Sequence, residues 1–315
     1  RKEFCMNVKP SLDELFERRI NFPDFEPQER LARLVGLDEH KDRLSKILGL
    51  LVNPYGIQEW AKKYHPDARA AVDTVLRRPP LVVLAGDVGS GKTELAETIG
   101  DAVARQEDID ITLYPLSLAT RGQGRVGEMT QLVSAAFDYT IEAADKLKNT
   151  NGKARGAVLL LIDEADALAQ SRENAQMHHE DRAGVNAFIR GIDRIANQKL
   201  PAAVLMCTNR LKALDPAVQR RAAEVLTFSR PNDEQRHYLL HSKLTGLGLN
   251  STAIEELVRL TGPRDTNSPG FTFSDITQRL IPSIILTAYP YSAVSVHSAL
   301  QVVNKMTPTP AFIDR

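Results

Sequence analysis

The sequence predicts an α/β fold, in which a five-stranded parallel sheet carries helices on both faces and a small all-helical domain follows. Short apolar runs alternate with helical patterns from residue 81 onward, as is typical of parallel sheets built from strand–helix–strand units. After Pro231 the pattern becomes wholly helical. The predicted strands are Leu81–Ala85, Ile109–Leu113, Val158–Ile162, Ala203–Thr208 and Val225–Phe228.

Helices are expected before, between and after these strands. A short helix is predicted from Ser11, its N-cap, to Arg19, and another begins near Val35. Asn53–Arg78 has a mostly helical pattern, and the clearest helices between strands cover 92–105, 128–147 and 183–196. The all-helical part is expected to contain Asp233–Leu244, Ser251–Leu260, Ser274–Ala288 and Ser292–Asn304.

Length and composition fit one large and one small domain with a substantial core. The chain has 315 residues, of which 43% are hydrophobic. We expect an N-terminal arm over 1–35, a large domain over 36–229, a helical domain over 230–305, and a tail over 306–315 that is disordered or extended.

The charge balance disfavours a general nucleic-acid or membrane surface, because 40 Lys and Arg offset 40 Asp and Glu. Cys5 and Cys207 have no spacing that suggests a disulfide or a zinc site, which fits a reducing compartment. The apolar stretch Leu280–Val303 is interrupted by Pro282 and Pro290, which argues against a membrane span. With no signal peptide visible, a soluble cytoplasmic protein is expected.

A phosphate-binding loop is predicted directly after the first strand. Residues 86–93 read Gly-Asp-Val-Gly-Ser-Gly-Lys-Thr and lead into a helix, so backbone N–H groups would converge on a phosphate at the helix N-terminus. Lys92 is expected to reach the β- and γ-phosphates of ATP, and Thr93 to hold Mg²⁺. The predicted contacts of the nucleotide in this loop are Asp87, Val88, Gly89, Ser90, Gly91, Lys92 and Thr93.

Two carboxylates follow the third predicted strand. Asp163 lies at its carboxyl end, where it is placed to bind the nucleotide's Mg²⁺ directly or through water. Glu164 is placed to orient and deprotonate the water that attacks the γ-phosphate, a contribution of roughly 10²- to 10⁴-fold in rate. The alternative, a plain acidic turn that ends a strand, is less favoured downstream of a phosphate-binding loop.

A third group of motifs follows the fourth strand: Thr208-Asn209-Arg210, Leu-Asp-Pro-Ala at 214–217, Arg220-Arg221, and Arg-Pro-Asn-Asp-Glu-Gln-Arg at 230–236. Together they resemble the second region of homology in the AAA subgroup of AAA+ ATPases. The resemblance implies a P-loop AAA+ sheet with a helical lid domain. It also implies that Asn209 is sensor 1, and that Arg220 and Arg221 are arginine fingers reaching into a neighbouring subunit. Fingers that act in trans imply a homo-oligomeric ring, most often a hexamer. The alternative is that Arg220 and Arg221 are ordinary solvated surface residues.

Three further segments are interpreted through the same resemblance. Gly36 belongs to a segment similar to the one that contacts adenine in AAA proteins, and Ser274 stands where some families carry a sensor 2 arginine. Gly124, Arg125 and Val126 align with the substrate-gripping pore loop, with Arg125 where an aromatic residue belongs. The alternative for this last segment is a glycine-rich surface loop.

Histidine pairs give little support for a metal site. His178-His179 lies in a polar loop after the Asp-Glu motif, where AAA proteins have their second pore loop. His237 and His241 share one face of a predicted helix, but no third ligand accompanies them. We therefore expect no transition-metal site at either pair.

The chain also resembles the pachytene checkpoint protein two family, whose human member is thyroid receptor-interacting protein thirteen. Residues 161–168 read Leu-Ile-Asp-Glu-Ala-Asp-Ala-Leu and residues 185–193 read Val-Asn-Ala-Phe-Ile-Arg-Gly-Ile-Asp, with spacing similar to that family. The resemblance covers roughly 81–282 and implies ATP-driven remodelling of HORMA-domain proteins. The short N-terminal arm resembles bacterial members, which restrain a cyclic-oligonucleotide synthase in antiphage signalling by disassembling its HORMA activator.

Three other functions stay open at this point. The chain could remodel another protein client, act on DNA, or serve as a nucleotide-gated scaffold with little turnover. A DNA-directed protein would be expected to carry a basic stripe and a sensor 2 arginine, and neither is visible. A scaffold would be expected to lack catalytic residues, whereas Lys92, Asp163 and Glu164 are all present.

Overall fold

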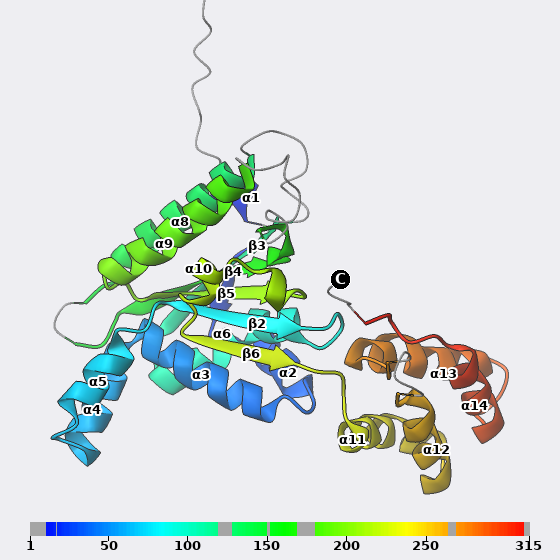
Figure 1. The fold of residues 1–315 in the computed structure, drawn as a ribbon. Coiled ribbons are helices and arrows are strands. Elements are labelled where there is room, and N and C mark those ends of the chain that lie inside the picture. The colour runs from blue at the N-terminus through cyan, green and yellow to red at the C-terminus, as the bar shows by residue number, and fades with distance from the viewer. Residues whose placement is uncertain are drawn as a thin grey trace, which may run out of the picture.

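The computed structural model describes residues 11–16, 18–118, 128–149, 152–168, 180–263 and 269–311. Its centre is a six-stranded sheet with the strand order β1-β3-β4-β5-β2-β6 (Figure 1). All neighbours pair in parallel except β1 and β3, which are antiparallel. The strands are β1 (Ile20–Phe22), β2 (Leu81–Gly86), β3 (Asp110–Ser117), β4 (Gly156–Asp163), β5 (Ala202–Thr208) and β6 (Glu224–Phe228).

The alternation of strands and helices is confirmed, but the predicted count of five strands is wrong. The sixth strand, β1, comes from the segment expected to be an arm, and its three residues are too short to show an apolar alternation. Phe22 of β1 is buried against α6 (Lys92–Glu107), where a side chain at Gly100 would approach its ring to within 2.3 Å. Residues 20–33 therefore pack on the large domain through β1 and α2 (Phe25–Arg33).

Helices cover both faces of the sheet, as predicted. Alternate residues of β2 point to opposite faces: Val82 and Leu84 belong to one buried apolar cluster, Leu81 and Val83 to the other. The first cluster includes residues of α3 (Asp38–Val52) and α6, and the second includes residues of α8 (Glu128–Asp145) and α9 (Glu180–Asn197). Smaller helices are α1 (Leu12–Leu15), α4 (Pro54–Tyr64), α5 (Arg69–Leu76) and α10 (Pro216–Gln219).

A helical unit follows β6 and has its own buried core, which includes Leu240, Ile254, Phe271 and Ile284 (Figure 1). One predicted helix is divided here into a π-helical stretch and α13, and Pro282 lies in the first turn of α13. The elements are α11 (Asp233–Leu244), α12 (Ser251–Thr261), the π-helix Asp275–Leu280, α13 (Ile281–Ala288) and α14 (Val296–Lys305).

The chain beyond α14 is extended and anchored, at least through residue 311. Thr309 donates its backbone N–H and its hydroxyl to the buried carboxylate of Asp275, at 2.9 and 2.7 Å. Arg279 binds the same carboxylate and also donates to the carbonyl of Thr307. The first residues of the predicted tail therefore pack on the helical unit.

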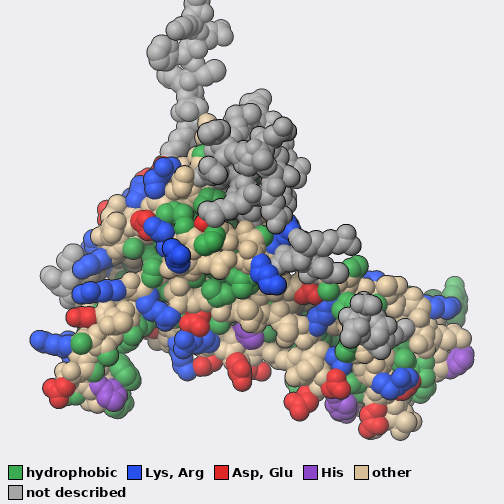
Figure 2. Space-filling view, viewed as in Figure 1, with side chains coloured by type: hydrophobic (Ala, Val, Ile, Leu, Met, Phe, Trp, Pro, Cys, Tyr) green, Lys and Arg blue, Asp and Glu red, His purple; other side chains and the backbone are tan. Residues whose placement is uncertain are grey.

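The surface shows no segregation of charge on the face drawn in Figure 2, where blue and red side chains are interspersed. This distribution agrees with the formal net charge of zero. Within the described residues, no helix combines the length and the apolar character needed to cross a membrane.

Candidate active site

A pocket of about 400 Å³ opens at the carboxyl ends of β2, β4 and β5, beside the helical unit. In parallel sheets this edge is the usual place for ligands, and the volume lies in the range of small-molecule sites. The walls come from the segment after α2, the loop after β2, the ends of β4 and β5, and the π-helix region. They are Leu34, Val88, Gly89, Gly91, Lys92, Thr93, Glu94, Asp163, Glu164, Cys207, Thr208, Asn209, Phe273, Ser274, Thr277 and Gln278.

The loop after β2 requires its glycines. Gly89 and Gly91 have φ values of 71° and 93°, in the left-handed region that glycine adopts most readily. A Cβ on Gly86 would approach the carbonyl oxygen of Phe228 to within 2.1 Å, and one on Gly89 would approach the hydroxyl of Thr272 to within 2.8 Å. The glycines thus let the backbone wrap closely around the N-terminus of α6, the arrangement that binds phosphate.

Lys92 is a buried cation held by backbone carbonyls. It is 6% exposed, and its Nζ donates to the carbonyls of Gly86 and Asp87 at 2.9 and 2.8 Å. Burial lowers the pKa of Lys92, although nearby acids oppose the shift. In the described part of the chain no carboxylate forms an ion pair with it. A buried cation without a carboxylate partner fits an anionic ligand such as a nucleotide phosphate.

The two predicted magnesium ligands lie together at the end of β4. Burial raises the pKa of Asp163, and hydrogen bonds from the Glu164 backbone and the Thr93 side chain oppose that rise. The contact between Thr93 and Asp163 joins the first turn of α6 to β4. A hydroxyl and a carboxylate at one point are hard oxygen donors of the kind that Mg²⁺ prefers.

Glu164 is held by a residue that the sequence analysis missed. Its φ of 53° is uncommon for a residue with a side chain, and its carboxylate accepts a hydrogen bond of 2.9 Å from the hydroxyl of Ser117. Ser117 is the last residue of β3 and lies in register with Asp163 of β4. The sequence prediction ended this strand at Leu113, whereas the strand continues through Pro115, which lacks an N–H for strand pairing.

Asp166 positions Asn209, a second role that the sequence analysis did not assign. The Asp166 carboxylate accepts hydrogen bonds from the backbone N–H and the side-chain amide of Asn209, at 3.1 and 3.2 Å. It also accepts from the hydroxyl of Thr208 and from the backbone of Arg210. One carboxylate after β4 therefore fixes the turn after β5 and directs the sensor 1 candidate toward the pocket.

The two candidate arginine fingers differ in their surroundings. Arg221 binds both carboxylate oxygens of Asp193 on α9, at 2.9 and 3.0 Å, and these contacts raise its pKa. Arg220 is exposed, and among the described residues its side chain has no recorded partner. Neither arginine lines the pocket of its own chain. The geometry leaves Arg220 available to a second molecule and holds Arg221 within this one.

Contacts between the large domain and the helical unit lie where the helical unit forms part of the pocket wall. Gly36, with a φ of 71°, accepts a hydrogen bond of 2.9 Å from the side chain of Gln235 on α11. The backbone of Ser274 donates to the carbonyl of Gly89 at 3.2 Å. Gly36 and Ser274 are thus both at the junction where the sequence predicts nucleotide contacts, and Ser274 lines the pocket.

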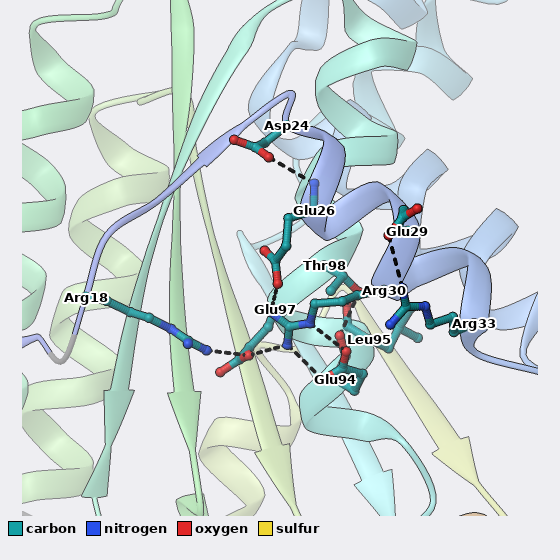
Figure 3. Close-up of polar contacts among 10 residues, drawn as sticks. All are labelled: Arg18, Asp24, Glu26, Glu29, Arg30, Arg33, Glu94, Leu95, Glu97 and Thr98. Carbon is teal, nitrogen blue, oxygen red and sulfur yellow. Dashed lines mark hydrogen bonds and ion pairs between the residues drawn. The ribbon is translucent and has the colours of Figure 1, made fainter. Parts of the chain in front are cut away.

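An ion-pair network joins the N-terminal segment to the helix that begins at Lys92 (Figure 3). Arg30 of α2 donates to both carboxylate oxygens of Glu94, each at 2.8 Å, and to Glu97 at 2.9 Å. Arg18 reaches Glu97 as well, at 2.6 Å. These carboxylates raise the pKa of Arg30. Because Glu94 lines the pocket, the N-terminal segment is part of its outer support.

Some predicted positions lie outside the described residues, among them Gly124, Arg125 and Val126 of the pore loop and His178-His179. His237 and His241 are described, and their rings stack with centroids 5.6 Å apart. Across the described ranges, no group of three or more histidine, cysteine or acidic side chains is arranged to hold a metal. Cys207 is fully buried beneath the pocket, and burial raises its thiol pKa well above the usual value.

Comparisons with known proteins place this site in a family context. The AAA family model (ATPase family associated with various cellular activities) matches residues 82–230. CD-NTase-associated protein 6 of Escherichia coli strain MS 115-1 is 98% identical over 98% of this chain and all of its own length.

Two solved structures give the same placement. One chain of the E. coli MS115-1 HORMA:CdnC:Trip13 complex superposes with a TM-score of 0.90 and 96% identity, over 97% of this chain and 100% of that one. Rhizobiales Trip13 gives a TM-score of 0.73 at 56% identity, over 93% of this chain and 99% of that one.

Proposed function

The chain belongs to the AAA family of ATPases, within its Trip13-like group, and on that premise we propose that it uses ATP to open or disassemble HORMA-domain protein complexes. The observation that carries this proposal is the match to a chain of a HORMA:CdnC:Trip13 complex at 96% identity. The active-site geometry supports the ATP-dependent part, because a phosphate-binding loop, a buried lysine and two strand-end carboxylates share one pocket.

Within the pocket, Lys92, Thr93 and Asp163 have roles in nucleotide binding. Lys92 exchanges the carbonyls of Gly86 and Asp87 for phosphate oxygens, and the loop amides bind the same phosphates. Thr93 and Asp163 would hold Mg²⁺. The ion would supply positive charge that offsets the negative charge of the phosphates.

Hydrolysis requires a positioned water. Glu164 takes its proton, and the hydrogen bond from Ser117 holds the Glu164 carboxylate at the pocket wall until then. Asn209, fixed by Asp166, is the sensor 1 residue that hydrogen-bonds near the γ-phosphate. Both residues lie at the carboxyl ends of neighbouring strands, so their separation is set by the sheet.

The site is incomplete without a second copy of the chain. Arg220 is exposed and does not line its own pocket, which supports a role as the finger of a neighbouring site in a homo-oligomeric ring, and we propose a hexamer. Arg221 supports the finger loop through Asp193. Gly124, Arg125 and Val126 are proposed to contact the client in the central pore.

The proposed client is a HORMA-domain protein bound to a cyclic-nucleotide synthase. Disassembly of that complex would make the chain a negative regulator of a bacterial antiphage signalling system, acting in the cytoplasm. The names of the relatives support this proposal, since one is associated with a CD-NTase and another forms a complex with HORMA and CdnC. The interspersed charges on the face drawn in Figure 2 and the formal net charge of zero give no support to a DNA-directed function.

A trapped variant tests the choice of client. Glu164→Gln should retain ATP without hydrolysing it, so a ring that carries it should hold its client. In a pull-down from the native host with ATP, we expect a HORMA-domain protein, identified by mass spectrometry. Lys92→Ala/Glu164→Gln, which should not bind ATP, is the matched control. Recovery of an unrelated protein, or of nucleic acid, would refute the HORMA assignment and leave the ATPase assignment intact.

A further inference from the structure

Arg230 lies where the chain passes from the sheet into the helical unit, between β6 and α11. Its side chain is 13% exposed and contacts both parts of the molecule. Nε donates to the Asp87 carboxylate at 2.7 Å, and Nη1 donates to the carbonyl of Gly270 at 2.5 Å. The planar guanidinium therefore spans from the phosphate-binding loop to the helical unit, which a single point charge could not do.

Asp87 is bound on two sides. Its carboxylate accepts hydrogen bonds from Arg230 and from the backbone N–H of Val88, and its carbonyl accepts one from Nζ of Lys92 at 2.8 Å. If Lys92 exchanges this carbonyl for another partner, Asp87, which also binds Arg230, therefore loses one of its hydrogen bonds. The Asp87 carboxylate is only 16% exposed, so its charge is little screened by solvent.

Gly270 begins the segment of the helical unit that contacts the loop. Four residues later, the backbone of Ser274 donates to the carbonyl of Gly89 at 3.2 Å, and the hydroxyl of Thr272 lies close to the same glycine. The segment is itself fixed, because Phe271 donates its N–H to the carbonyl of Thr261 on α12. A displacement of Gly270 is therefore expected to move α12 as well.

We propose that Arg230 is a positioning residue, which couples occupancy of the phosphate-binding loop to the orientation of the helical unit. It does so by holding Asp87 and the Gly270 carbonyl at the same time. When Lys92 turns to a phosphate, it releases the Asp87 carbonyl, and Asp87 can then shift. Arg230 transmits this shift to the Gly270 carbonyl, and the helical unit changes its orientation. We call the pair of contacts that Arg230 makes with Asp87 and Gly270 the Arg230 bridge. The proposal rests on the nucleotide site described above and concerns how binding at that site moves the chain.

Two variants distinguish the connection that Arg230 makes between Asp87 and Gly270 from simple neutralisation of the Asp87 charge. Arg230→Lys keeps a positive charge for Asp87 but lacks the fork needed to reach Gly270 as well. Arg230→Gln removes the positive charge that faces the Asp87 carboxylate beside the phosphate site, and nucleotide affinity should fall on the order of tenfold. Arg259→Gln is the matched control, because Arg259 pairs on its own helix with Glu256 and is 70% exposed.

The experiment measures the distance between spin labels at Lys46→Cys on α3 and Glu255→Cys on α12, in a Cys5→Ser background. Both positions are exposed, and the remaining cysteine, Cys207, is buried. Labelled subunits are diluted into an excess of unlabelled chain, and distances are recorded without nucleotide, with ADP, and with ATP in the Glu164→Gln background. Affinity for a fluorescent ATP analogue is measured on the same samples.

We expect a nucleotide-dependent distance shift in the wild-type sequence and in Arg259→Gln. In Arg230→Lys the shift should be lost, while affinity for the analogue stays within about threefold of wild type, since the charge beside Asp87 is retained. An unchanged shift in Arg230→Lys would overturn the proposal, as would a wild-type chain that binds the analogue without any shift. Failure of the nucleotide site itself would be seen separately, as absence of analogue binding in the wild type.

Discussion

Replacing Arg220 with alanine is expected to lower the steady-state rate of ATP hydrolysis by about 10³- to 10⁵-fold, the range reported for arginine fingers supplied in trans. Affinity for ATP should stay close to wild type, because Arg220 does not line the pocket of its own chain. Arg221→Ala should reduce the rate less, since Arg221 is committed to Asp193 and acts by supporting the loop.

The measurement is ATPase activity of mixtures of Arg220→Ala chains with Glu164→Gln chains, each nearly inactive alone. A finger in trans predicts that activity is partly restored in the mixture, because the intact pocket of an Arg220→Ala subunit receives Arg220 from a Glu164→Gln neighbour. Arg194→Ala is a suitable control, because Arg194 pairs with Asp138 between α9 and α8 and is half exposed. No recovery of activity in the Arg220→Ala/Glu164→Gln mixture, or a larger effect from Arg221→Ala alone, would contradict the assignment.

Glu164→Gln is expected to reduce the rate of hydrolysis by about 10²- to 10⁴-fold, the usual contribution of a general base. The amide cannot accept the proton of the attacking water, yet it has nearly the same size, so nucleotide affinity should be unchanged. Lys92→Ala provides the contrast: it removes the buried cation from the phosphate loop and should abolish detectable binding.

Single-turnover hydrolysis and equilibrium binding of ATP, measured on both variants, distinguish these roles. Glu164→Gln should bind without turnover, and Lys92→Ala should do neither. Normal turnover by Glu164→Gln would mean that another group activates the water. Tight ATP binding by Lys92→Ala would remove the phosphate-binding assignment of the loop.

The central parallel strands β2, β4 and β5 were predictable because each is buried along nearly its whole length and reads as an apolar run. The short antiparallel strand β1 was not, because its place depends on pairing with β3, far along the chain. The end of β3 was also missed, since Pro115 normally argues against a strand interior. In the fold, β3 continues through Pro115, and this extension brings Ser117 to Glu164.

In the candidate site too, some residues were predictable from the sequence and others were not. Lys92, Asp163 and Asn209 were predicted from local motifs that fix both a turn and a residue type, and all three line the pocket. Asp166 and Arg230 were not assigned roles, because their partners lie 43 and 143 residues away in the chain. An isolated acid or arginine carries no mark of a long-range partner in a single sequence. The different surroundings of Arg220 and Arg221 likewise depend on Asp193, a residue of another helix.

The most direct test of the central claim is a disassembly assay. A preformed complex of a HORMA-domain protein and its cyclic-nucleotide synthase is mixed with the chain and ATP, and the fraction of synthase still bound to the HORMA protein is followed by size-exclusion chromatography. Our account predicts dissociation with ATP and the wild-type chain, and none with ADP, with Lys92→Ala or with Glu164→Gln. A complex that stays intact while the wild-type chain hydrolyses ATP beside it would contradict the account.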